Sequence, residues 1–284
     1  MLDWLLDPLS YQFMQNAIAV GVLVGILCPV VGSFLIVQRM ALLGDVIAHA
    51  VLPGLAIANF LQAGILVGSF ISGMLSTALI AWIRSQTRVK VDAAMALAFS
   101  SFFSLGILLF TLLDTRLNLE EILFGDILSV STADVWQAGV ITVLLLVVVR
   151  LFYKELLFYT FDRAGAEAAG LPVNLIHYSM MAAITLAIIV GMQTVGVVLV
   201  ISLLVGPAIT AYLLVKQLHW MMILGAGLGV VASLSGMYIS YYRDVPSGPA
   251  IALVTFALFF LALLFSPYQG ILTRPRAARK SDNS

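Results

Sequence analysis

Long apolar stretches alternate with short polar connections along almost the whole chain. A helix that crosses a bilayer core of about 30 Å needs roughly 20 apolar residues, and each stretch has about this length. We expect about nine spanning helices, within a range of eight to ten, at residues 11–37, 41–61, 64–84, 93–113, 133–153, 174–191, 195–215, 220–241 and 247–266. The pattern therefore predicts an all-α polytopic membrane protein.

Two segments depart from this regular pattern. Residues 41–61 contain Asp45, His49 and Pro53 within an otherwise apolar stretch. Segment 117–131 is too polar and too short to cross a bilayer. We expect it to form a short helix within a loop, either re-entrant or lying in the outer interface.

Composition supports the same class of protein. Of the 284 residues, 62% are hydrophobic and 10% are charged, whereas about a quarter of the residues in a soluble domain are charged. The net charge of zero provides no basic field for phosphates, so no nucleic-acid partner is expected. We expect one transmembrane domain at 1–270, embedded in the lipid bilayer, followed by a polar, mobile cytoplasmic tail at 271–284.

Charged residues are distributed unequally between the two ends of the expected helices. Lys and Arg mark cytoplasmic connections, so we expect the N-terminus outside and the C-terminus in the cytoplasm. This orientation leaves only Arg116 and Arg243 outside. The inner side then holds Arg39, Arg84, Arg88, Lys90, Arg150, Lys154, Arg163, Lys216, Arg274, Arg276, Arg279 and Lys280. The outer side holds the acidic residues Asp3, Asp7, Asp114, Glu120, Glu121, Asp126, Asp134 and Asp244.

Asp45 and His49 are the two ionisable residues placed together within an expected span. Residues four apart lie on one face of a helix, so both side chains can reach one ion. An ionisable group inside a membrane is costly and suggests a function. A structural role stays open, because Asp45 could cap a helix or pair with Arg39 and His49 could donate to a backbone carbonyl.

The chemistry of this pair favours a transition metal. A carboxylate with an imidazole suits Mn, Fe or Zn, whereas Ca and Mg prefer all-oxygen sites. Two ligands make a weak site, but a twofold homodimer with this face on its axis would supply two Asp and two His. The metal is expected as a transported substrate, and no permanently bound cofactor is expected.

Two enzyme classes lack their motifs in this chain. There is no H-E-x-x-H sequence for a zinc protease and no G-x-x-x-x-G-K-[ST] loop for ATP. We therefore expect a transport protein without catalytic residues of its own. The cytoplasmic stretch at 161–174 predicts a short helix with Asp162 as N-cap and a stop at Gly170 and Pro172. It could dock on a partner or simply connect two spans.

Four sequence elements resemble the membrane permease subunit of bacterial metal-ion ABC importers, the family that takes up manganese, zinc and iron. The most specific element is RMALLGDVIAHAVLPG at 39–54, similar to the family's signature in the metal pathway. The others are VGVVLVISLLVGPAITAYLL at 195–214, DVPSGPAI at 244–251 and FDRAGAEAAGLP at 161–172. Tyr212 departs from the pattern, because family members often have Arg at this position.

The resemblance implies the ABC importer permease fold in a bacterial inner or plasma membrane. It implies a homodimer, two ATP-binding cassette subunits on the cytoplasmic face and an extracytoplasmic metal-binding protein. Asp45 and His49 match the family's metal positions, and HAVLPG resembles the manganese type, with zinc or iron as the alternative. An alternative from another class is a stand-alone secondary carrier or channel. The ATPase-coupling helix corresponds to Asp162, Ala164, Ala168, Gly170, Leu171 and Pro172.

Overall fold

A computed structural model describes residues 7–113, 122–123, 125, 127, 130–267 and 270–272. Within these residues the fold is helical throughout, and no strand is present. Nine helical stretches of this part of the chain are long and apolar enough to cross a membrane, with α3 and α4 together counted as one. The expected all-α fold with about nine spans is therefore confirmed.

The spanning helices follow the predicted stretches closely. They are α2 (Gln12–Val37), α3 (Leu42–Ala50), α4 (Leu52–Phe60), α5 (Ile65–Gln86), α6 (Val91–Leu112), α8 (Thr132–Leu151), α11 (Val173–Val195), α12 (Val197–Leu214), α13 (Leu218–Arg243) and α14 (Ser247–Phe265). Three shorter elements are the 3-10 turn η1 (Pro8–Ser10), α9 (Tyr153–Phe161) and α10 (Arg163–Ala168).

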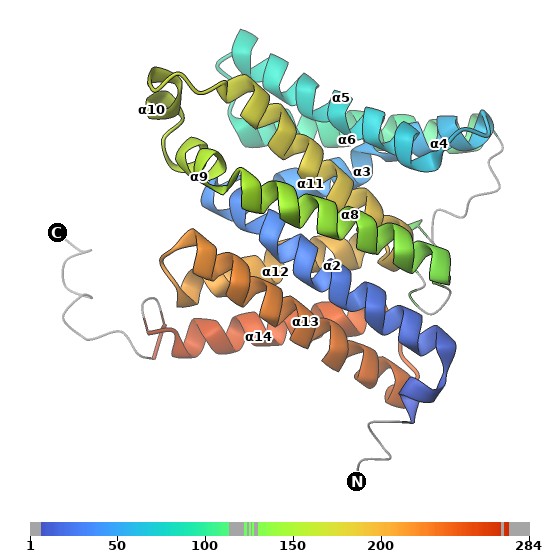
Figure 1. The fold of residues 1–284 in the computed structure, drawn as a ribbon. Helices are drawn as coiled ribbons and strands as arrows, with labels where there is room; N and C mark the ends of the chain where they lie inside the picture. Colours follow the sequence, from blue (N-terminus) through green and yellow to red (C-terminus); the bar gives the residue numbers. More distant parts are fainter. Residues whose placement is uncertain are drawn as a thin grey trace.

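Helix α2 lies in the middle of the bundle, between α8 and α13 (Figure 1). Its side chains Leu27 and Phe34 are buried in the core. Helices α2 and α13 approach each other closely at Gly25 and Gly229, where a Cβ on either glycine would collide with the backbone carbonyl of the other. Small residues at four-residue spacing allow this backbone contact, which is a main source of helix association in lipid.

The second span is broken into two short helices at Val51. Helix α4 begins at Leu52, so Pro53 falls within its first turn. Proline has no N–H to donate, but the first turn of a helix has no intrahelical acceptor for that group, so proline is tolerated there. The break leaves α3 as a separate nine-residue segment, and this segment carries Asp45 and His49.

Two connections differ from the sequence prediction. Helix α11 continues to Val195, whereas we expected its span to end at 191, and Gly196 alone joins it to α12. Gly196 has φ +84°, a conformation that residues with a Cβ rarely adopt, so glycine permits this one-residue turn. Helix α9 was not predicted; it buries Leu156 and Tyr159 and so forms part of the packed structure.

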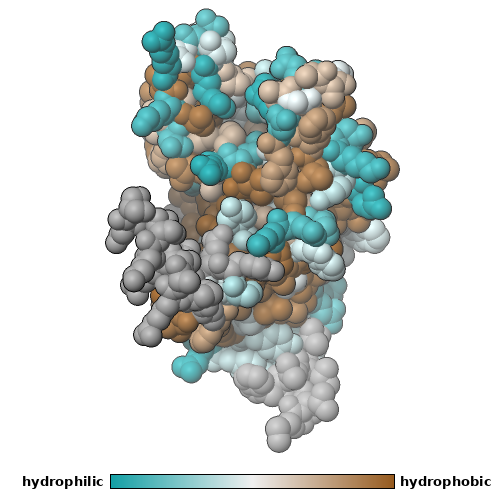
Figure 2. Space-filling view, turned by 90° about the vertical axis from the view of Figure 1, so that its left-hand side faces the viewer, coloured by the Kyte–Doolittle hydropathy of each residue, from teal (hydrophilic) through white to brown (hydrophobic). Residues whose placement is uncertain are grey.

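The described cationic residues gather at one end of the bundle. Every described Lys and Arg except Arg243 lies at the end with α9 and α10 (Figure 1). Figure 2 looks onto this end and shows hydrophilic residues scattered among hydrophobic ones on the surface. Segment 117–131 and the tail at 271–284 lie mostly outside the described residues, so the expectations for them stay predictions.

Candidate metal site

Helix α3 separates its side chains into a buried face and an open face. Leu43 and Ile47 are almost completely buried against the bundle. Leu42, Asp45 and His49 lie on the other side, and the Leu42 side chain is exposed. The Asp45 side chain retains 42% of its accessible surface and that of His49 retains 16%. The pair therefore faces out of the single chain, although it belongs to a spanning segment.

Asp45 and His49 contact each other directly, as their four-residue spacing predicts. Nδ1 of His49 lies 3.3 Å from Oδ1 of Asp45 and 3.0 Å from the Asp45 backbone carbonyl oxygen. A proton on Nδ1 is shared between these two oxygens and leaves the lone pair on Nε2. This is the form in which an imidazole binds a metal, with its other nitrogen held by a carboxylate or carbonyl.

Two aromatic rings of α6 hold His49 in place. The imidazole meets Phe99 edge-on at 4.9 Å between ring centroids and Phe103 at 5.2 Å. These contacts restrict the imidazole and leave the Asp45 side of the pair open. The sequence prediction missed both phenylalanines, because nothing in a single sequence indicates that α6 packs against α3.

The alternative structural roles can be compared with this geometry. Helix α3 begins at Leu42 with Ala41 as N-cap, so Asp45 does not cap it. In the described part of the chain, the ion-pair contact of Asp45 is with His49 and not with Arg39. The contact from His49 to a backbone carbonyl is present, and it leaves the metal-binding nitrogen available. No group of three or more His, Cys, Asp or Glu comes together among the described residues, so one chain offers two such ligands here.

The segment after α9 forms the short helix α10, which was expected near 161–174. The side chain of Asp162 accepts a hydrogen bond of 2.8 Å from the Gly165 backbone N–H, as an N-cap does. Gly170, with φ +83°, ends the helix before Leu171 and Pro172. The N-cap and the stop are therefore both confirmed.

Helix α10 has one buried and one open side. Ala166 is buried, whereas Ala164 and Ala168 are exposed. Arg163 lies 5.8 Å from the centre of the Tyr159 ring on α9. Burial raises the pKa of the Tyr159 hydroxyl, and the positive charge of Arg163 opposes this shift. Helix α10 thus packs on α9 and presents small side chains outward.

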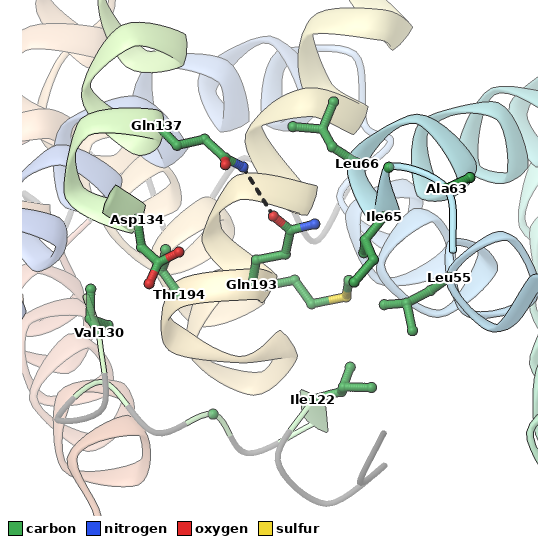
Figure 3. Close-up of a pocket in the computed structure, with 13 residues that line it drawn as sticks. Leu55, Ala63, Ile65, Leu66, Ile122, Val130, Asp134, Gln137, Gln193 and Thr194 are labelled. Carbon is green, nitrogen blue, oxygen red and sulfur yellow. Dashed lines mark hydrogen bonds between the residues drawn. The ribbon is translucent and has the colours of Figure 1, made fainter. Parts of the chain in front are cut away.

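A separate cavity of about 850 Å³ lies at the end opposite α9 and α10. Gln137 of α8 donates a hydrogen bond of 3.2 Å to Gln193 of α11 across it (Figure 3). Asp134, which also lines this cavity, accepts hydrogen bonds from Ser131 in the capping box of α8. No other described acidic residue and no histidine lines this cavity, so it does not form a second metal site.

The fold and this pair of side chains define an integral, multi-pass membrane protein with a candidate metal site in a broken span. Residues 10–266 match the ABC 3 transport family, and the chain belongs to that family. This confirms the resemblance seen in the sequence.

Individual relatives cover nearly the whole chain. The chain is 44% identical over 267 residues to the manganese transport system membrane protein MntC of Halalkalibacterium halodurans, covering 94% of this chain and 91% of that protein. It is 36% identical to a probable iron transport system membrane protein of Haemophilus influenzae, over 94% of this chain and 98% of that protein. A chain of the solved structure of PsaBC from Streptococcus pneumoniae in complex with Fab matches with a TM-score of 0.87 and 36% identity, covering 95% and 98%. The expected permease fold is thereby confirmed.

Proposed function

We propose that this chain is the permease subunit of an ATP-driven importer of divalent transition-metal ions, with manganese as the first candidate. The observation that carries this proposal is the Asp45–His49 pair, a carboxylate and an imidazole in contact on the open face of a spanning segment. A relative named for manganese transport, at 44% identity, supports manganese. A relative named for iron transport supports iron as the alternative. The same donor set also binds zinc.

We propose that two copies of the chain form the metal pathway. An Asp45 side chain with 42% exposure would meet lipid if the chain were alone, at high energetic cost. A second copy related by a twofold axis would cover this face and complete a site with two carboxylates and two imidazoles. Such a site gives the ion four ligands without a permanent cage, so the ion can leave again.

The two ends of the bundle differ in charge, and we use this difference to place the partner subunits of the importer. The end rich in Lys and Arg is assigned to the cytoplasm, where two ATP-binding cassette subunits hydrolyse ATP. The opposite end carries Asp7, Asp134 and Asp244 and receives metal from an extracytoplasmic binding protein. The permease itself lies in the bacterial plasma membrane. Its transmembrane domain is assigned to 1–270 and its cytoplasmic tail to 271–284.

Helix α10 is proposed to dock on the ATPase subunit through its exposed alanines. Replacing Ala168 with tryptophan is expected to reduce copurification of the ATPase subunit by about tenfold, because a bulky ring on a docking face prevents close contact. Pull-down from detergent-solubilised membranes measures this. The control is Ser85→Trp on α5, which adds the same ring at an exposed position of the same end. Equal copurification of both variants would remove α10 from the interface.

The proposed function is tested by elemental mass spectrometry of cells that lack the chain. Expression of the wild-type chain is expected to restore manganese several-fold, and vanadate should block this recovery because ATP hydrolysis drives it. Recovery of iron or zinc instead would change the assigned metal, and the chain would still be a metal transporter. Recovery that persists without any ATPase subunit and stops with an ionophore would favour a stand-alone carrier. No change in any metal would contradict the proposal.

A further inference from the structure

A long apolar groove runs along the face formed by α2, α8 and α13. Its volume is about 820 Å³. Helix α2, which lies between the other two helices in Figure 1, contributes Ile26 and Val30 to its lining. The apolar lining comes from Ile26 and Val30 of α2, Leu146 and Val149 of α8, and Met222 and Val230 of α13. No residue of α3 lines this groove, so it is separate from the Asp45–His49 pair.

One end of the groove is cationic. Arg150, Tyr153 and His219 line it at the end where the Lys and Arg residues gather. A second cavity of about 610 Å³ shares Tyr153 and His219 and adds Lys154 and Lys216. Neither cavity is lined by a described Asp or Glu. Burial raises the pKa of the Tyr153 hydroxyl, and a hydrogen bond with the backbone of His219 opposes this shift, so α9 and α13 meet at this end.

The length of the groove matches one leaflet of a bilayer. His219 and Val230 lie at its two ends along α13, which puts them about 16 Å apart at 1.5 Å per residue. Half of a hydrocarbon core of about 30 Å is about 15 Å. The groove thus extends from the cationic surface to the middle of the membrane.

The space within the groove is open. Gly227 lines it, and a Cβ added there would meet no heavy atom within 4 Å. Gly229, two residues further along the same helix, points toward α2 and has no room for a Cβ. Gly227 therefore keeps the groove wide and has no role in helix packing.

We propose that this groove is a binding site for an anionic phospholipid, with an acyl chain along Ile26, Val30 and Gly227 and its phosphate beside Arg150 and His219. The apolar channel, its one-leaflet length and a cationic end whose lining holds no described Asp or Glu together fit this chemistry. Basic pockets between helices at the cytoplasmic surface bind such headgroups. The inference goes beyond the proposed function and does not depend on the metal.

Native mass spectrometry of the purified full-length chain tests this site with added phosphatidylglycerol and phosphatidylcholine. The wild type is expected to bind phosphatidylglycerol more tightly. Arg150→Gln should weaken the binding of phosphatidylglycerol by about fivefold, because one cation near the surface is removed. The binding of phosphatidylcholine should not change. Gly227→Leu should weaken the binding of both lipids by about tenfold, because the leucine side chain occupies the channel.

Two matched controls separate the groove from the general surface. Arg88→Gln removes a charge from an exposed loop at the same end, and Gly139→Leu adds the same side chain to α8 outside the groove. Both should bind lipid as the wild type does. Equal lipid binding by all variants would overturn the proposal. So would a Gly227→Leu chain that loses dimers while its lipid binding is unchanged, since the groove would then be a protein interface. Displacement of phosphatidylglycerol by inorganic phosphate would support the anion site and assign it to a soluble anion.

Discussion

Replacing His49 with alanine is expected to lower the initial rate of manganese uptake by about 100-fold, because the site loses its nitrogen donor in both copies. Asp45→Asn keeps a similar shape but removes the charge, and it is expected to lower the uptake rate by about tenfold. Uptake of radioactive manganese into cells with equal amounts of each variant in the membrane measures both. The larger loss is expected for His49 because alanine removes Nε2, the proposed metal-binding nitrogen. Asparagine at position 45 keeps an oxygen that can still accept from Nδ1, which lies 3.3 Å from Oδ1 in the wild type.

The matched control for the carboxylate is Asp92→Asn. Asp92 is exposed in the first turn of α6 and is not part of the proposed metal site, so its replacement should leave uptake at the wild-type rate. If Asp92→Asn and Asp45→Asn reduced uptake equally, general surface charge would explain the effect. Uptake at the wild-type rate in His49→Ala would remove this pair from the pathway altogether.

The His49→Ala variant also tests the proposed homodimer. Cells that express wild-type and His49→Ala chains in equal amounts form three kinds of pairs at random. If the ion needs ligands from both copies, only pairs of two wild-type chains work, and about a quarter of the uptake remains. About half would remain if each chain worked alone.

The second large effect concerns the contact between α2 and α13. Replacing Gly229 with leucine is expected to destabilise the folded chain by about 3 kcal/mol, because the added side chain overlaps the Gly25 carbonyl and backbone cannot yield. Thermal unfolding in detergent and the size-exclusion profile measure this. Gly227→Leu is the control in detergent without added lipid, since the same side chain on the same helix meets open space. Equal stability of the two variants would show that the helices separate freely at this point.

The spans could be predicted from the sequence because the bilayer requires long apolar helices and satisfies no backbone hydrogen bonds. The stop of α10 at Gly170 and its N-cap at Asp162 were equally accessible, because both depend on local backbone chemistry. The contact between Gly25 and Gly229 could not be predicted in this way. Pairing of helices depends on which faces meet in three dimensions, and the sequence does not contain that directly.

The candidate site shows the same division. The contact between Asp45 and His49 follows from helical periodicity and was predicted. The edge-on contacts with Phe99 and Phe103 depend on the packing of α6 against α3, so they appear only in the fold. The helix ends were misjudged where tertiary contacts extend a helix, as at Val195, and where a short amphipathic helix such as α9 follows a span without a break.

The one-residue turn at Gly196 has a mechanical consequence. Helix α11 has 23 residues, which makes it a rod of about 35 Å, and it begins next to α10. At its other end, Gln193 lines the 850 Å³ cavity, and no slack separates Val195 from α12. A tilt of this rod by about 5° about the end beside α10 moves the end with Gln193 by about 3 Å. A rotation of α11 at the end beside α10 would thus displace its far end most, and it would change the shape of the cavity that Gln193 lines.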